Sequence, residues 1–276
     1  MTIVVVSDVH LGSDVGRKRR GTGHATDDLA LDPLFQTFMG FISKEYLHAY
    51  DDRLIFLGDI FDFWRRDAAE VLIKNQEAVS RMKEISKMCR VNYVIGNHDY
   101  MIREMWEKSG IKGLFHSMDK ILHLEINGEL FTFMHGHQLE VLANPYNKSE
   151  KLYDSISEML CYTAGVTGSA ASALWSLIDP EAHSDYMKSM KKPTSERLTG
   201  KHNAIGAVEG LAQAKSRMVY TGAGGWLVYG HTHRGYVDED SKTVNTGSWG
   251  RNGDDSTLDY LIIENGKPML CTYEIK

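Results

Sequence analysis

The chain has 276 residues, of which 42% are hydrophobic and 25% charged, and its formal net charge is −6. This composition is typical of a globular protein. The negative net charge argues against nucleic-acid binding driven by overall charge. No apolar run approaches the roughly 18 residues that cross a bilayer. Because the three cysteines are scattered and the chain starts with a strand-like run rather than a secretory signal, we expect a soluble cytoplasmic protein.

Strands and helices alternate over the first hundred residues. The expected strands are residues 3–6, 54–57 and 93–95, and the expected helices are residues 32–50, 68–89 and 101–109. The strand runs are short and apolar without polar alternation, which is typical of strands buried on both faces of a sheet. Asp32 before Pro33 predicts the N-cap and first turn of the first helix. This alternation predicts a layered α/β fold.

A basic cluster from Arg17 to Arg20 follows the first predicted strand. Charge runs of this kind are usually solvated loops, and we favour that interpretation. The alternative is a loop that contacts a substrate phosphate over an active site.

The pattern changes after the third helix. Residues 121–126 and 130–134 predict a hairpin around Asn127 and Gly128, a pair typical of tight turns. Residues 139–222 are expected to be helical, and the last expected strands are residues 227–229, 236–237, 243–244, 258–263 and 269–274. We therefore predict one domain over residues 1–276, with a helical insertion, or cap, at residues 139–222.

Residues of metal-binding types follow five of the predicted strands. They are Asp8 and His10, Asp59, Asn97, His135, and His231 and His233. In α/β sheets the ligand site lies beyond the carboxyl ends of the strands, so side chains delivered there by separate strands converge. This convergence is the central structural prediction.

A pair of divalent cations is the chemistry that these residues suit. Two such ions clamp an in-line displacement at phosphorus, and they need carboxylates, neutral imidazoles and a bridging ligand. Asp59, alone at its strand end, suits the bridge. Taken singly, a histidine after a strand is more often a structural hydrogen-bonding group, and a Gly-Asp pair is more often a turn. Both alternatives lose weight because five such clusters occur in one chain.

The motifs also carry a family resemblance. They are Asp8-Val9-His10, Gly58-Asp59 with Asp62, Gly96-Asn97-His98-Asp99, His135-Gly136 and Gly230-His231-Thr232-His233. In this order they resemble the motifs of calcineurin-like metallophosphoesterases. The resemblance implies an α/β fold that is a four-layer αββα sandwich, and a dinuclear site for divalent metal ions. Mn²⁺ is the first expectation, with Fe, Zn²⁺ or Ni²⁺ as alternatives.

The resemblance further implies residue roles. One ion would be held by Asp8, His10, Asp59 and His233, and the other by Asp59, Asn97, His135 and His231. A bridging hydroxide would attack phosphorus, His98 would protonate the leaving oxygen, and Asp62 would orient His98; a nearby carboxylate keeps an imidazole protonated near neutral pH. Residues 245–248 resemble the segment that backs such a site. Arg234 is a candidate phosphate contact, with a plain surface arginine as the alternative.

The amino-acid sequences of the motifs most resemble those of a subgroup that contains UDP-2,3-diacylglucosamine diphosphatases. In that subgroup a helical insertion forms a cap for acyl chains. The insertion of this chain carries the apolar side chains Met159, Leu160, Leu174, Trp175, Leu177 and Ile178. These suit an acyl groove or, as we favour, ordinary packing on the domain. His98 and His137 depart from the subgroup, which has Arg and Asp at these positions. His98 instead follows the pattern of general phosphomonoesterases and phosphodiesterases.

We therefore expect a metal-dependent phosphoesterase that hydrolyses a phosphate ester or a diphosphate in a nucleotide- or lipid-linked substrate, such as a UDP-diacylglucosamine-like diphosphate. The alternatives are a phosphoprotein phosphatase, a cyclic-nucleotide or nucleic-acid phosphodiesterase and, last, a non-catalytic scaffold. The expected partner is a phosphorylated small molecule or lipid-linked substrate, with a peripheral membrane contact through the insertion left open. The acidic charge disfavours nucleic acid.

Overall fold

The fold is taken from a computed structural model, which describes residues 1–12, 31–64, 68–108, 113–143, 150–163, 208–213, 224–249 and 257–274. The basic cluster of Arg17 to Arg20 and most of the predicted insertion, including Trp175, lie outside these residues. The insertion and the single-domain organisation therefore remain predictions. The parts of the insertion that are described are helical: α5 (His137–Ala143), α6 (Glu150–Thr163) and a short segment at residues 208–213.

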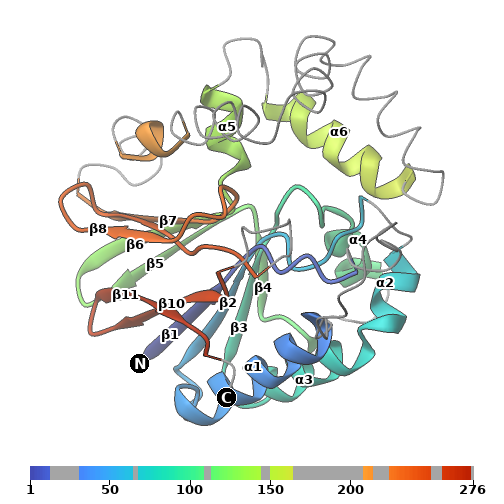
Figure 1. The fold of residues 1–276 in the computed structure, drawn as a ribbon, viewed down its shortest axis with the longest axis horizontal. Helices are drawn as coiled ribbons and strands as arrows, with labels where there is room; N and C mark the ends of the chain where they lie inside the picture. The colour runs from blue at the N-terminus through green and yellow to red at the C-terminus, as the bar shows by residue number, and fades with distance from the viewer. Residues whose placement is uncertain are drawn as a thin grey trace, which may run out of the picture.

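Two sheets form the centre of the molecule (Figure 1). The first has the order β11 (Lys267–Thr272), β10 (Asp259–Glu264), β1 (Thr2–Val6), β2 (Arg53–Leu57), β3 (Arg90–Val94) and β4 (Ser117–Asp119). The second has the order β5 (Ile121–Ile126), β6 (Glu129–Met134), β7 (Trp226–Tyr229), β9 (Thr243–Asn245) and β8 (Tyr236–Asp238). Strands β1 to β4 run parallel, as do β6, β7 and β9. Their carboxyl ends therefore lie along one edge of each sheet.

Alternate residues of the strands pack on opposite sides, as the apolar runs predicted. Ile3 and Val5 of β1 face the second sheet and form a core with Phe131 and Val228. Val4 and Val6 face the other way, toward the helices, in a separate core. Burying both faces of a strand excludes water from its ladder and explains why the run lacks polar residues.

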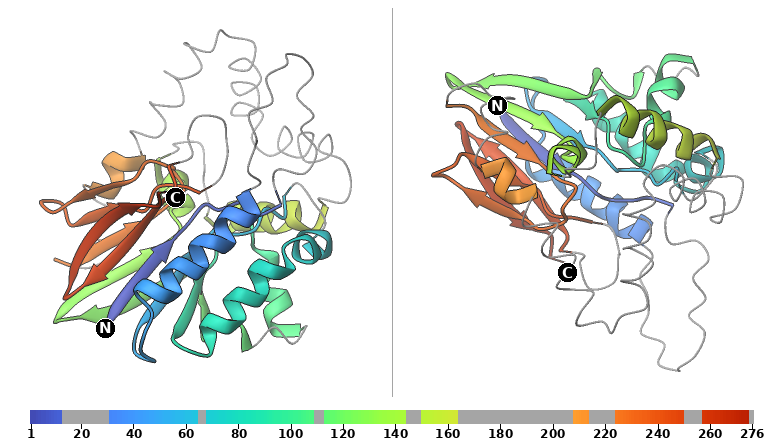
Figure 2. Two further views of the ribbon diagram at one scale, coloured as in Figure 1. Left: turned by 60° about the horizontal axis from the view of Figure 1, so that its bottom comes forward. Right: turned by 90° about the horizontal axis from the view of Figure 1, so that it is seen from above.

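Helices cover both outer faces of the sheet pair (Figure 2). α1 (Leu31–Glu45) and α3 (Gln76–Ser86) pack on the first sheet through residues such as Phe38 and Met82. On the second sheet, Leu139 of α5 and Val208 pack against Leu227 and Tyr229. The predicted four-layer αββα sandwich is thereby confirmed.

Two helix predictions were wrong in detail. The predicted N-cap Asp32 lies inside α1, which already includes Leu31, and α1 ends at Glu45 rather than near Tyr50. The predicted helix 68–89 is two helices, α2 (Ala68–Lys74) and α3, separated by Asn75. The Asn75 side chain donates to the carbonyl of Val71 at 2.9 Å. The Asn75 backbone amide donates to the same carbonyl at 3.1 Å, so the side chain shares this acceptor with the backbone, a pattern that bends helices.

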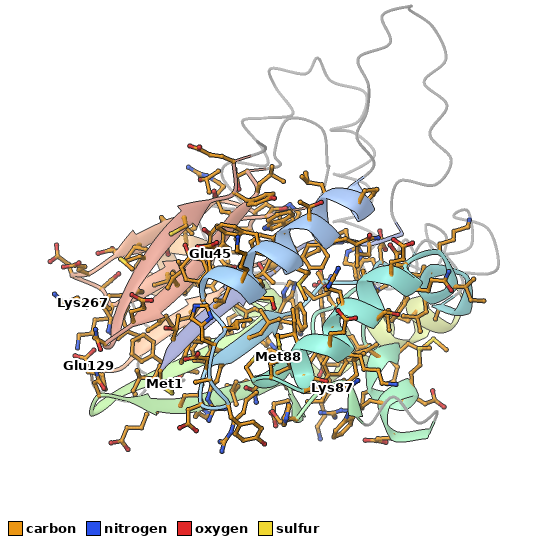
Figure 3. All side chains as sticks on the ribbon, turned by 90° about the horizontal axis from the view of Figure 1, so that it is seen from below. Met1, Glu45, Lys87, Met88, Glu129 and Lys267 are labelled. Carbon is orange, nitrogen blue, oxygen red and sulfur yellow. The ribbon has the colours of Figure 1, made fainter. Side chains whose placement is uncertain are left out.

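The starts of β1 and β6 lie at the end of the sheets opposite to the carboxyl ends of the parallel strands. Met1 and Glu129 lie there together with Lys267 (Figure 3).

The predicted hairpin turn is also confirmed: Asn127 and Gly128 have φ of 52° and 80° and join β5 to β6. Two successive positive φ angles are those of the tight hairpin turn that Asn-Gly favours. None of the described helices, including α4 (Met101–Lys108), is long and apolar enough to cross a membrane.

Candidate metal centre

The predicted site residues follow strands whose carboxyl ends meet. Asp8 and Asp59 lie just beyond β1 and β2, and Asn97 lies beyond β3. His135 comes directly after β6, and His231 lies beyond β7 in the second sheet. Backbone hydrogen bonds join these loops: the Asp8 amide donates to the Gly58 carbonyl at 3.1 Å, and the Gly230 amide donates to the His135 carbonyl at 2.8 Å. The site thus spans both sheets.

Two groups of potential cation ligands lie side by side. Asp8, His10 and His233 form one, and Asp59, His135 and His231 form the other, with the ligand atoms of each group within 4.8 Å of one another. Within the groups, His233 Nε2 lies 3.2 Å from Asp8 Oδ1, and His135 Nε2 lies 3.2 Å from Asp59 Oδ2. Between them, His10 Nε2 is 3.9 Å from Asp59 Oδ2. Asp59 therefore contacts both groups.

A third group consists of His10, Asp62 and His98. His98 Nδ1 lies 3.0 Å from Asp62 Oδ1, and the His98 ring meets the His10 ring edge-on at 4.9 Å between centroids. Both residues with a predicted catalytic role thus lie beside the first cation group.

Several buried polar atoms at this centre fit a cation. Among the residues described, Asp8 Oδ1, His10 Nε2, Asn97 Oδ1 and His135 Nε2 are buried and lack a hydrogen-bond partner. Buried polar atoms in native proteins are nearly always satisfied, and an ion is one of the accepted explanations for exceptions. All four belong to the residues predicted to hold cations. The donor set of carboxylate, amide oxygen and imidazole suits Mn²⁺, Fe or Zn²⁺.

The charges at the centre also favour a cation. Burial would raise the pKa of Asp8, yet His233 and His135 hold it at about 2. Burial likewise opposes ionisation of Asp59, but His135 and His98 keep its pKa well below the ordinary value. Two ionised carboxylates in a buried site attract positive charge strongly.

The imidazoles respond in opposite directions. Burial, together with the neighbouring His98, lowers the pKa of His10 to about 4, so His10 is neutral and can coordinate. Burial alone would lower the pKa of His135 as well, but Asp59 and Asp8 raise it to about 10. His135 is therefore protonated when no cation is bound, and a divalent cation would compete with this imidazolium for Asp59 and Asp8.

The backbone at the site adopts an uncommon conformation. Nine described residues other than glycine have a positive φ, and five of them are Asp8 (53°), His10 (52°), Asp59 (53°), His231 (67°) and His233 (61°). The left-handed region costs an L-residue roughly 1–2 kcal/mol. Strain of this kind persists where the surrounding structure enforces it, and it concentrates at functional sites.

Two motif glycines provide the space that the carboxylates occupy. A Cβ on Gly96 would lie 2.1 Å from Asp59 Oδ1, and one on Gly230 would lie 2.5 Å from Asp8 Oδ2. No other residue can be accommodated at such distances unless the aspartates move. The glycines in the Gly-Asn-His and Gly-His-x-His motifs are therefore part of the site.

A second set of hydrogen bonds orients the candidate ligands. His135 Nδ1 donates to the Leu57 carbonyl at 2.9 Å, so Nε2 is the nitrogen that could coordinate a cation. The His98 amide donates to Asp59 Oδ1 at 2.8 Å. Ser7 Oγ lies 2.7 Å from Thr246 Oγ1 and donates to Asp8 Oδ2 at 2.5 Å. The segment that was predicted to back the site contacts it.

Some residues at the site were not assigned a role from the sequence. The Trp64 ring stacks on His98 at 4.0 Å between centroids, and Glu140 of α5 accepts a hydrogen bond from His231. Trp64 could have been noticed because it follows Asp62 closely, whereas nothing in the sequence indicates which way Glu140 points. Arg234, a candidate phosphate contact, lies 3.6 Å from Glu209 in an ion pair.

Comparisons with known proteins show which family the chain resembles. A family model described as calcineurin-like phosphoesterase matches residues 1–235. A UDP-2,3-diacylglucosamine hydrolase of Shewanella sp. (strain W3-18-1) is 23% identical over 92% of this chain and 91% of its own length. One from Shewanella piezotolerans (strain WP3 / JCM 13877) is 23% identical over 83% of this chain and 92% of its own. Among solved structures, an archaeal phosphodiesterase covers 99% of this chain and 100% of its own, with 14% identity and a TM-score of 0.43.

Proposed function

The chain belongs to the calcineurin-like phosphoesterase family, and from this premise we propose that it hydrolyses its substrate at a centre for two divalent cations. Family membership makes it a metal-dependent phosphoester hydrolase. The observation that carries the proposal is the pair of adjacent Asp/His groups. When bound, the cations would supply an activated water and offset the negative charge on the oxygens around phosphorus.

The chain's own residues divide between the two cations. We assign Asp8, His10, Asp59 and His233 to one, and Asp59, Asn97, His135 and His231 to the other. Asp59 would contribute to both cations, because its Oδ2 lies 3.2 Å from His135 Nε2 and 3.9 Å from His10 Nε2, one nitrogen in each set. The unsatisfied Asn97 Oδ1 supports its place in the second set.

His98 would supply the proton where the leaving oxygen needs one, as an alcohol oxygen does. Asp62 accepts a hydrogen bond from His98 Nδ1 at 3.0 Å, so Nε2 is the nitrogen that would donate to the leaving oxygen. Trp64, stacked at 4.0 Å, limits rotation of the imidazole. Asp62 is a positioning residue, because it acts on the substrate only through His98.

The substrate class that we propose is a nucleotide-linked diphosphate. Relatives named UDP-2,3-diacylglucosamine hydrolase cover more than nine-tenths of the chain, which supports this choice. A phosphate mono- or diester is the second candidate, and the His98–Asp62 pair favours it. An alcohol oxygen needs a proton to leave, whereas a departing phosphate, with a pKa of about 6, leaves without one.

The test is a comparison of kcat/KM in Mn²⁺-supplemented buffer. The substrates are p-nitrophenyl phosphate, bis-p-nitrophenyl phosphate and a UDP-linked diphosphate that carries acyl chains. We expect the diphosphate to be cleaved with the highest kcat/KM and a chelator to abolish turnover. A higher kcat/KM for either p-nitrophenyl ester would select the second candidate. Turnover that survives the chelator would contradict the metal centre.

A further inference from the structure

Helix α5 places a carboxylate behind one of the proposed cation ligands. Oε2 of Glu140 lies 2.7 Å from Nε2 of His231. An ionised carboxylate only accepts hydrogen bonds, so Nε2 carries the proton and donates it. The lone pair of His231 is then on Nδ1, and a neutral imidazole nitrogen with a lone pair is the form that coordinates a cation.

Glu140 itself stays outside the cation groups. His231 belongs to a group with Asp59 and His135, and no group of three potential ligands among the described residues includes Glu140. Glu140 therefore contacts the ligand rather than the cation. It also accepts a hydrogen bond from Tyr153 of α6 at 3.5 Å, so two helices of the insertion meet at this carboxylate.

The conformation of His231 depends on support from both sides. Its φ of 67° lies in the left-handed region, and its amide donates to Asp8 Oδ2 at 2.9 Å. Asp8 thus holds the backbone and Glu140 holds the ring. Carboxylates that accept the second ring N–H of a metal-bound histidine set its tautomer and orientation, and their loss weakens metal affinity by about 10–100-fold.

We propose that Glu140 is a positioning residue for His231 and sets the affinity of the second cation. This inference rests on the proposed function, since it assumes that His231 is a cation ligand. It also gives α5 a role in cation binding, because Glu140 lies on this helix.

The test measures Mn²⁺ binding to the metal-free full chain by isothermal titration calorimetry. The variants are Glu140→Ala, Glu140→Gln, which keeps an accepting oxygen, and Glu158→Ala, an exposed glutamate of α6, as the control. We expect two Mn²⁺ sites in the wild type and the control. In Glu140→Ala one site weakens about 10–100-fold while the other is unchanged, and Glu140→Gln is intermediate.

A second readout separates positioning from loss of structure. The electron paramagnetic resonance signal of the coupled Mn²⁺ pair should be weaker in Glu140→Ala than in the wild type at a Mn²⁺ concentration just sufficient to saturate the wild type. The Tm of the metal-free chain should be unchanged. If both Mn²⁺ affinities in every variant equal those of the wild type, the proposed role of Glu140 is overturned and the proposed function is not. A wild type without two Mn²⁺ sites would overturn the proposed function together with this role.

Discussion

At the scale of single residues, the proposed proton transfer depends on His98. Asp62 fixes its Nδ1 at 3.0 Å, Trp64 stacks on one face of its ring at 4.0 Å, and His10 meets it edge-on at 4.9 Å. A ring held from these directions needs little reorganisation before it transfers a proton. His98 is therefore the side chain whose loss should affect chemistry without affecting cation binding.

We expect His98→Ala to lower kcat by about 10²–10⁴ on substrates with an alcohol leaving group, because general acid catalysis contributes about that much. The Mn²⁺ content, measured by inductively coupled plasma mass spectrometry, should stay at the wild-type level. His48→Ala, an exposed histidine at the opposite end of the sheets, is the control. An unchanged kcat in His98→Ala would rule out a role for this side chain in proton transfer.

Cation binding at His135 should release a proton. The pKa of this ring is raised to about 10, against the effect of burial, by Asp59 and Asp8. Since that pKa lies above 7, the cation-free ring is protonated at pH 7, and coordination through Nε2 must displace the proton. Calorimetric titrations with Mn²⁺ at pH 7, in buffers of different ionisation enthalpy, should show about one proton released from His135. An apparent enthalpy that is the same in every buffer would contradict this prediction.

Most candidate site residues could be predicted because they lie beyond an apolar run that ends in a small residue, whereas His135 directly follows Met134. Their backbone conformation could not. Asp59 and His231 adopt left-handed φ angles that isolated aspartate and histidine seldom adopt, and only the contacts of the folded chain enforce them. Glu140 was equally hidden, because helical periodicity does not say which polar side chain meets a loop from another strand.

At the scale of elements, the short loops after the strands determine how closely the carboxylates approach. We expect Gly96→Ala to displace Asp59, since the new Cβ would lie 2.1 Å from Oδ1 and 2.4 Å from the amide nitrogen. A displacement of about 1 Å can cost roughly 10² in rate. The measurement is kcat/KM with the Mn²⁺ content of the same sample.

Gly128→Ala provides the matched comparison. Gly128 also has a positive φ, 80°, but nothing lies within 4 Å of the position of its Cβ. This variant should lose about 1–2 kcal/mol of unfolding free energy in a urea titration, from backbone strain alone, and retain wild-type turnover. If Gly96→Ala kept wild-type activity, the close approach of β2 and β3 loops would not be needed for the site.

The elements themselves differ in how far they could be predicted. Strands β1, β2, β3 and β7 were recognisable because burial on both faces leaves an uninterrupted apolar run. Strand β4 is three residues long, Ser117–Asp119, and too short to show a pattern. The break between α2 and α3 lies at Asn75, whose side chain donates to the Val71 carbonyl, and helical periodicity does not reveal it.

At the scale of the whole molecule, the cations should act as part of the folded structure. Ligands that bind only the folded chain stabilise it by an amount that grows with concentration, about 2.7 kcal/mol per site at 100 times the Kd. We therefore expect Mn²⁺ to raise the Tm of the metal-free chain by several degrees, and Asp8→Asn to reduce that rise. Differential scanning calorimetry measures both. A Tm that changes with neither Mn²⁺ nor a chelator would contradict the prediction that cation binding stabilises the folded chain.

The arrangement of two sheets was predicted from the family resemblance rather than from the apolar pattern. Period and burial indicate that β1 and β6 are strands, but they do not assign them to different sheets. That assignment matters to the site, because the first sheet supplies Asp8, Asp59 and Asn97, and the second supplies His135 and His231. The centre forms only where the two edges meet.

The most direct test of the paired-cation centre is a crystal structure of the chain grown with Mn²⁺, with anomalous scattering used to locate the metal. The proposal predicts two anomalous peaks about 3.5–4 Å apart. One should lie among Asp8, His10 and His233, the other among Asp59, His135 and His231. The proposal would be contradicted if the map at saturating Mn²⁺ showed no anomalous peak within either group. It would also be contradicted if the structure showed the side chains of each group far apart.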